Sequence, residues 1–442
     1  MNKQNNHISV EPSRPAGLPP LPKIKQVALL VDDKNYSQVD LYAQHILRVL
    51  PNDPYANLAC AWVACKLKLH VQGIRFLQRV KENEAQHDRS VELMCADMHI
   101  NINELESLTQ SISPVDNKDN SYHLAKAWGF GFGSEMSALM GQAYLAEVCN
   151  RELIVHWGNN FLYRPSAGDE CVFDYYFERF NELTVNSVTD KLGDVFPPKW
   201  NEKNIHKENI NKRKGEYSKL SALYFLNRNE ALTVADYYTG VIHIKPWIEK
   251  ESLLNSMTVD EAYRYLAKKY LRPKKAIVEQ VNAFVETNLS KPFVAVHARG
   301  SDKDEGYRAL TSIPGQILQC AKQRLAEMPE GTKLFLMTDD NALLKVYQKE
   351  FGERLIQTDC QRCDTQVGVH YDQQTDKLQA GKEMLIDMLV AARADCFIGL
   401  GLSNPSQLIT YFGDFDADNY ILFGENRLKQ FNTHLYKTIP VR

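Results

Sequence analysis

Long apolar runs are missing from this sequence of 442 residues. No stretch reaches the roughly eighteen consecutive apolar residues that a membrane-spanning helix needs. The first residues, Met1 to Lys23, are polar and then rich in proline, without the charged start and apolar core of a secretory signal. We therefore expect no membrane span and a cytoplasmic location.

A strong excess of charge is also absent. The chain has 52 Lys and Arg against 55 Asp and Glu, which gives a formal net charge of -3. A large basic surface for nucleic acid is not expected from this balance. A small anionic ligand in a local cationic pocket fits the composition better than a polyanion does.

Cysteine is sparse and does not form metal-site patterns. The nine cysteines are an odd number spread thinly along the chain, which is typical of reduced thiols rather than of a disulfide framework. Cys360-Gln-Arg-Cys363 has no second pair at zinc-ligand spacing. We expect neither a metal site nor a redox site there.

The pattern of apolar residues divides the chain into four segments. Residues 1–35 are expected to form an extended or disordered arm because they are rich in proline. Residues 36–115 have the three-and-four spacing of amphipathic helices. Residues 116–275 and 276–442 alternate strand and helix candidates, which predicts two α/β domains. Two such halves suit an acceptor in the first and a nucleotide-linked donor in the second.

The helical segment has weak features of a repeat protein. A helix near Leu41–Leu50, the turn Pro51-Asn-Asp-Pro54, an alanine-rich helix and an amphipathic helix over Val71–Val80 resemble tetratricopeptide repeats. Residues 36–115 are then either a docking module for a protein partner or acceptor, or a helical cap on the next domain. Both interpretations stay open.

In the second α/β segment, four apolar runs alternate with helical patterns. Such an order predicts a parallel sheet with right-handed crossovers. The predicted strands are Phe293–His297, Lys333–Met337, Arg354–Gln357 and Cys396–Gly399.

Polar motifs follow three of these strands, at the edge where α/β sheets bind ligands. They are His297-Ala-Arg-Gly-Ser-Asp-Lys303, Thr338-Asp-Asp340 and Gly399-Leu-Gly-Leu-Ser-Asn404. Arg299 and Lys303 supply cationic donors for a phosphate, and Asp302 supplies a carboxylate. Each motif alone also fits a purely structural role, as a charged turn, a helix cap or an ordinary strand-to-helix turn.

A glycine-rich segment, Gly129-Phe-Gly-Phe-Gly-Ser134, precedes a predicted helix over Ser134–Asn150. Glycines let backbone amides approach an anion at a helix N-terminus. The segment partly matches a dinucleotide fingerprint but lacks a clear preceding strand. We do not interpret it as an NAD site.

With these motifs in place, residues 120–420 resemble the α-1,6-fucosyltransferases, including the nodulation fucosyltransferase, and more distantly the protein O-fucosyltransferases. The resemblance rests on the glycine loop, on a His-x-Arg-Arg-Thr-Asp-Lys block at His297–Lys303, on Thr-Asp-Asp at Thr338–Asp340, and on a Leu-Asp to Ala-Asp stretch at Ile386–Asp395. One departure is Gly300, which stands where the family's block has its second arginine.

The resemblance implies a GT-B-like pair of Rossmann-type domains with a cleft between them. It implies inverting transfer of L-fucose from GDP-fucose to a hydroxyl of a glycan or glycoconjugate, without a metal or a bound cofactor. Arg299 would bind the donor diphosphate, and Glu305 or Asp304 would act as the base. The donor-binding residues implied in this way are Gly131, Phe132, Gly133, His297, Arg299, Asp302, Lys303, Asp339, Asp387, Ser403 and Asn404.

Two other functions stay open at this point. One is a GT-B glycosyltransferase that uses a different nucleotide sugar, because the residues of the strand-end motifs suit a phosphate and a nucleotide better than they suit fucose. The other is a non-catalytic nucleotide-sugar-binding or adaptor protein that works through its helical module. Gly300 and the unassigned base are the features that favour the adaptor alternative.

Overall fold

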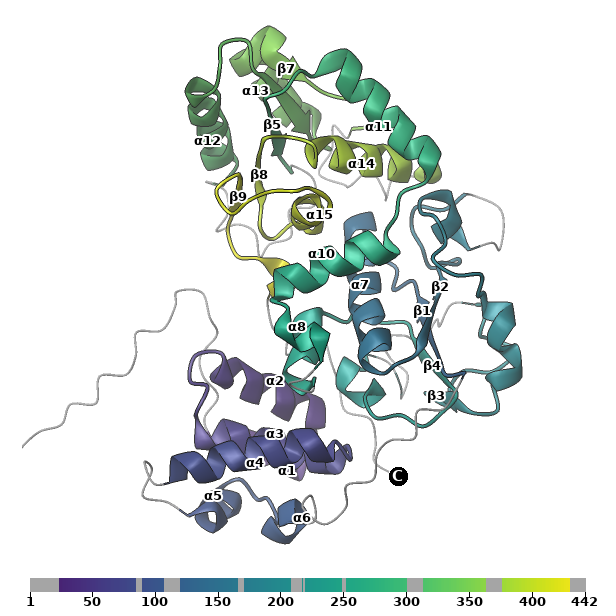
Figure 1. Ribbon diagram of the computed structural model, residues 1–442, viewed down its shortest axis with the longest axis vertical. Helices are drawn as coiled ribbons and strands as arrows, with labels where there is room; N and C mark the ends of the chain where they lie inside the picture. The colour runs from purple at the N-terminus through teal and green to yellow at the C-terminus, as the bar shows by residue number, and fades with distance from the viewer. Residues whose placement is uncertain are drawn as a thin grey trace, which may run out of the picture. The chain divides into compact units, whose positions relative to one another are not determined.

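The computed structural model of the chain is shown in Figure 1. It describes residues 24–84, 90–106, 120–165, 171–207, 217, 219–248, 252–299, 313–362 and 376–429. The chain divides into two compact units, residues 1–113 and 114–439. The two α/β segments predicted at 116–275 and 276–442 thus share one unit.

The first unit is helical. Its third helix begins at Pro54 because the Asp53 side chain accepts a hydrogen bond from the amide of Ala56 at 2.8 Å, and proline fits the first helical position. Most of this helix is buried through small side chains, which let its neighbours approach closely. The helices are α1 Ile24–Asp32, α2 Tyr36–Leu47, α3 Pro54–Lys66, α4 His70–Glu84, α5 Val91–Asp97 and α6 Ile102–Glu106.

Helix α1 lies inside the segment predicted to be an extended or disordered arm, so that prediction is wrong for residues 24–32. Val27, Ala28 and Val31 have helical spacing and are buried. The nearby prolines, which end at Pro22, hid this short amphipathic pattern. The helices expected at 41–50, after Pro54 and at 71–80 are α2, α3 and α4. The tetratricopeptide resemblance stays a prediction.

The second unit begins with a four-stranded parallel sheet in the order β2-β1-β4-β3. Helix α7 (Phe132–Val148) packs against β1 and β2. An irregular segment, from Val185 to Ile205, supplies apolar residues to a core shared with Leu124 and Ile154 of the sheet. The strands are β1 Tyr122–Lys126, β2 Glu152–His156, β3 Val195–Phe196 and β4 Leu232–Ala235.

A five-stranded parallel sheet follows, in the order β7-β6-β5-β8-β9. Strand β5 is fully buried because helices cover both faces of the sheet, as expected for parallel sheets. Its strands are β5 Phe293–His297, β6 Lys333–Met337, β7 Leu355–Ile356, β8 Cys396–Leu400 and β9 Tyr420–Phe423. The helices around it are α11 Lys275–Asn288, α12 Ile313–Glu327, α13 Asn341–Phe351, α14 Lys377–Ala391 and α15 Asn404–Phe412.

The predicted α/β class, with two Rossmann-type halves built on parallel sheets, is confirmed. In each sheet the direction of strand addition reverses, between β1 and β4 in the first and between β5 and β8 in the second. Ligands of such sheets bind at the carboxyl ends of the strands beside this reversal. Among the described helices, none combines the length and the apolar character required to cross a bilayer.

Strand β1 precedes the glycine segment, so the prediction that this segment lacks a preceding strand is wrong. The sequence signal was hidden by His123, a polar residue in the middle of the strand. Its Nδ1 lies 2.8 Å from Thr233 Oγ1, and its Nε2 lies 2.8 Å from Gln142 Oε1. Burial lowers the pKa of His123 to about 4, so the ring is neutral and both nitrogens are satisfied inside the sheet.

Helix α10 (Val259–Tyr270), which sequence patterns did not reveal, joins the two halves of this unit. It contacts both α7 and α15. The Tyr263 ring stacks on Tyr411 of α15 with centroids 5.3 Å apart, and the Tyr411 hydroxyl donates to Asp260 Oδ1 at 3.0 Å. This contact places α15 beside α7.

Two glycines near α7 allow a test of this packing. A Cβ added to Gly141 would lie 1.8 Å from the carbonyl oxygen of Thr239, whereas one added to Gly131 meets no atom within 4 Å. We expect Gly141→Ala to lower the free energy of unfolding by more than about 2 kcal/mol, because a backbone atom blocks the new methyl group. Gly131→Ala is the matched control, and its urea midpoint should stay close to that of the unchanged protein. Equal midpoints for the two variants would contradict the packing described.

Candidate functional site

The glycine loop between β1 and α7 is organised by a buried carboxylate. Glu135, in the first turn of α7, is 1% exposed. Its two carboxylate oxygens accept hydrogen bonds from the amides of Trp128 (3.1 Å), Gly129 (2.5 Å) and Phe130 (2.9 Å). Hydrogen bonds to a charged acceptor are stronger than neutral ones. These three loop amides therefore serve Glu135 and are not donors to an external anion.

The next residues reach the N-terminus of α7, where Gly131 is the N-cap. The space beside Gly131 is open. The first-turn amides of a helix, with the aligned peptide dipoles, favour an anion at such a position. The part of the glycine motif that suits a donor phosphate is thus Gly131 to Gly133.

Phe132 was predicted among the donor-binding residues, but its side chain points into the core. The ring is fully buried and packs against Phe161, Tyr163, Tyr176 and Phe177, with centroids 4.8 to 6.5 Å away. The ring of Phe132 therefore serves the core and is not available for a contact with the donor.

His297 ends β5 and is 5% exposed. Its Nδ1 lies 2.7 Å from the hydroxyl of Ser406 on α15, and this hydroxyl also accepts the Leu400 amide at 3.1 Å. Burial lowers the pKa of His297 to about 4, against the opposing effect of the nearby Asp339 carboxylate. His297 is therefore neutral, and it ties β5 to β8 and α15.

Arg299 lies two residues beyond β5 and is half-buried. Its positive charge contributes to the lowered pKa of His297, which places Arg299 close to that ring. Asp339 is also near His297, whereas Asp340 caps α13 by accepting the amides of Ala342 (2.6 Å) and Leu343 (3.1 Å). The cap interpretation of the Thr-Asp-Asp motif therefore holds for Asp340, and Asp339 lies at the ligand edge of the sheet.

Ser403 is the N-cap of α15 and is fully buried. A serine at this position normally accepts a hydrogen bond from a first-turn amide, but Ser403 makes no such side-chain bond. Within the described part of the chain, its Oγ has no hydrogen-bond partner. A buried hydroxyl without a partner is rare and calls for an explanation. The adjacent Asn404 is 8% exposed.

The N-termini of α7 and α15 meet. A Cβ on Gly133 would lie 2.7 Å from Cδ of Pro405, so glycine is needed for this approach. Helix α15 contacts α7, and both of these helices contact α10. Two positive helix ends from two different sheets therefore face one place, together with Ser403. That arrangement is suited to an anion.

Asp387, predicted to contact the nucleotide, lies on α14 and is 3% exposed. Thr358, just beyond β7, donates to its Oδ1 at 2.5 Å. Burial raises the pKa of Asp387 to about 6. Its carboxylate thus has an internal partner, which holds the segment after β7, and the nucleotide contact stays a prediction.

The remaining predicted residues, Asp302, Lys303, Asp304 and Glu305, lie outside the described residues, as do Gly300 and Cys363. Burial raises the pKa of the Cys360 thiol to about 12, which keeps it protonated. Across the described ranges, no group of three or more His, Cys, Asp and Glu has a metal-binding arrangement.

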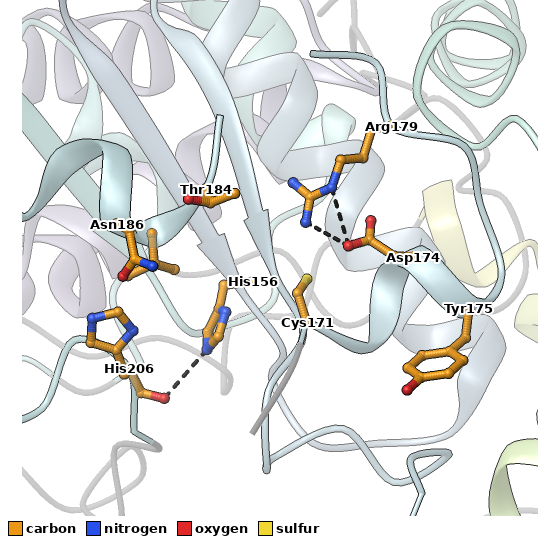
Figure 2. A pocket seen from close by; sticks show the side chains of 9 residues that line it. His156, Cys171, Asp174, Tyr175, Arg179, Thr184, Asn186 and His206 are labelled. Atoms are coloured by element: carbon orange, nitrogen blue, oxygen red, sulfur yellow. Dashed lines mark hydrogen bonds and ion pairs between the residues drawn. The ribbon is translucent and has the colours of Figure 1, made fainter. Parts of the chain in front are cut away.

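A cavity at the carboxyl end of β2 was not anticipated from the sequence. Its volume is about 500 Å³, and His156, Arg179 and His206 are among the residues that line it (Figure 2). One signal was available, because His156 follows the apolar run Leu153-Ile-Val155 just as His297 follows Phe293 to Val296. The residues from 165 to 230 have no clear periodicity, which hid the rest of the lining.

Comparison with known proteins gives matches to solved structures only. No family model and no curated protein sequence matches the chain. NodZ α-1,6-fucosyltransferase soaked with GDP-fucose is similar at 16% identity and a TM-score of 0.45, covering 68% of this chain and 96% of that one. NodZ from Bradyrhizobium, at 15% identity, has a TM-score of 0.45 and covers 68% and 97%. POFUT1 in complex with GDP-fucose has 16% identity and a TM-score of 0.41, and covers 70% and 99%.

The role of Glu135 can be tested by removing its charge. Glu135→Gln keeps the size of the side chain but weakens three hydrogen bonds from loop amides. We expect the free energy of unfolding to fall by about 1–3 kcal/mol, as for other bonds to charged groups. Glu152→Gln, on the exposed end of β2, is the control and should change it by less than about 0.5 kcal/mol. Equal urea midpoints for both variants would show that the loop does not depend on Glu135.

Proposed function

We propose that this protein is a glycosyltransferase that transfers L-fucose from GDP-fucose, with inversion, to a hydroxyl of a glycan or glycoconjugate. One observation carries the proposal. The N-termini of α7 and α15 meet at Gly133 and Pro405, beside the unpartnered hydroxyl of Ser403. This place suits the diphosphate of a nucleotide sugar.

Arg299 and Ser403 have complementary parts in this proposal. Arg299 lies at the carboxyl end of β5, and Ser403 follows β8, so they flank the reversal point of the second sheet. The guanidinium supplies a fixed positive charge and the serine hydroxyl supplies a hydrogen bond. His297 acts as a positioning residue, because its bond to Ser406 fastens the two strand ends together.

The chemistry follows from the charge that develops. The bond between C1 of fucose and the diphosphate oxygen breaks, and its electron pair stays on GDP. The acceptor oxygen forms a new bond to C1 from the opposite face, and its proton passes to a base, for which Glu305 and Asp304 are the candidates. Arg299 and the helix ends are already oriented toward the departing negative charge, which lowers the barrier. Independence of metal ions is part of this proposal.

Arg299→Ala tests the diphosphate role. We expect loss of fucose transfer by more than about 100-fold, because a charged donor in a preorganised site contributes several kcal/mol. Calorimetry should also show weaker GDP binding with an unchanged urea midpoint. Arg324→Ala, on the exposed side of α12, is the control and should retain both properties. Tighter binding of UDP than of GDP by the unchanged protein would favour a different nucleotide sugar. Binding of GDP-fucose without any release of GDP would favour the adaptor alternative.

A serine pair separates ligand binding from folding. Ser403→Ala removes a buried hydroxyl that has no partner among the described residues, so the urea midpoint should hardly change. The affinity for GDP should fall by roughly 10-fold, which corresponds to one hydrogen bond of about 1.4 kcal/mol. Ser406→Ala is the contrasting variant, since it breaks contacts with His297 and Leu400 and should lower the midpoint. Unchanged GDP affinity in Ser403→Ala would remove Ser403 from the site.

A further inference from the structure

The cavity at the end of β2 lies at the ligand edge of the first sheet. The carbonyl oxygen of His156 accepts the amide of Ala127, at 3.3 Å, where the glycine loop begins. On its other side, the cavity is lined by residues of the short helix Val172–Tyr175. The next residue, Tyr176, packs on α14 of the second half so closely that a Cβ on Gly381 would lie 2.4 Å from its hydroxyl oxygen. The cavity is thus connected to the glycine loop through the backbone of His156, and to the second half through Tyr176, the neighbour of its lining residue Tyr175.

The charged groups that line the cavity neutralise each other. Arg179 donates from Nε (3.1 Å) and Nη2 (2.5 Å) to Asp174 Oδ2, as drawn in Figure 2. Its Nη1 donates to the carbonyl oxygen of Leu183 at 3.0 Å. The guanidinium is therefore committed to the protein. An anionic ligand would have to compete with Asp174 for it.

His156 presents an uncharged ring. Burial, together with the positive charge of Lys126, lowers the pKa of His156 to about 4. Its Nε2 donates to the carbonyl oxygen of His206 at 3.3 Å, which leaves Nδ1 as an acceptor. Figure 2 shows His156 and His206 side by side on one wall of the cavity.

Among the described residues of the lining, the other groups are also neutral. Asn186, which is exposed, offers an amide that both donates and accepts hydrogen bonds. Tyr175, on the opposite side in Figure 2, is 36% exposed and offers an aromatic face beside a hydroxyl. The volume of about 500 Å³ is within the usual range for small-molecule sites. Neutral donors and acceptors with an aromatic rim match a sugar, which has many hydroxyls and no charge.

We propose that this cavity binds a neutral sugar unit of the acceptor glycan. The inference rests on the proposed transferase function, and it assigns the acceptor to the first sheet while the donor diphosphate is held at the second. It commits to an uncharged saccharide and not to an anionic one, because Arg179 and Asp174 are paired with each other.

Direct binding of oligosaccharides tests the cavity without any requirement for turnover. The full chain, with and without saturating GDP, would be titrated with chitotetraose, maltotetraose, cellotetraose and mannotetraose, and with an anionic oligosaccharide, sialyllactose. We expect at least one neutral oligosaccharide to bind more tightly than sialyllactose. For that ligand, Tyr175→Ala and Asn186→Ala should each raise the Kd by about 5- to 10-fold, the effect of one lost stacking or hydrogen-bond contact.

Three controls make the result specific. Tyr175→Phe keeps the ring and should retain most of the affinity, and Asn288→Ala, on the exposed end of α11, should change nothing. GDP affinity should be the same in all four variants. Absence of binding by every neutral oligosaccharide, tighter binding of sialyllactose, or an unchanged Kd in Tyr175→Ala and Asn186→Ala would overturn the proposal. If the unchanged protein binds an oligosaccharide but does not bind GDP, the result would instead contradict only the transferase function.

Discussion

The buried carboxylate of Glu135 is the interaction on which the proposed site depends. A charge that is 1% exposed is costly unless several donors compensate it, and here three consecutive loop amides do so. The loop then has one conformation, which ends at the open N-terminus of α7. Glycine at position 129 is required in this turn because its φ of 85° is disfavoured for other residues.

The second constraint is the close contact between two helix N-termini. Gly133 permits Pro405 to approach α7, while the stacked rings of Tyr263 and Tyr411 hold α15 from the other side. Because α7 and α15 belong to the halves built on different sheets, neither half alone would form the proposed anion site. In the glycine motif, the amides of Gly129 and Phe130 are occupied by Glu135, which leaves Gly131 to Gly133 for an anion.

Sequence patterns predicted those strands that consist mainly of consecutive apolar residues. Strands β5 and β6 were predicted with their observed bounds because each contains a run of four apolar residues. Strand β1 was missed because His123 finds its partners only in the folded sheet. For the site, Arg299 and Ser403 lie just beyond β5 and β8, as their place in the sequence predicted, and their part in the site stays a prediction. The burial of Phe132 and the cavity beside His156 depend on tertiary contacts between distant segments, which a local pattern does not contain.

The electrostatics of the two proposed subsites differ in a way that suits a transfer reaction. The donor side concentrates positive potential through helix ends and Arg299, where a diphosphate gains negative charge as the bond breaks. On the proposed acceptor side, Arg179 and Asp174 form an ion pair with each other, and burial keeps His156 neutral by lowering its pKa. In this proposal, a neutral acceptor pocket would not compete for the diphosphate, so the two halves would distinguish their substrates by charge.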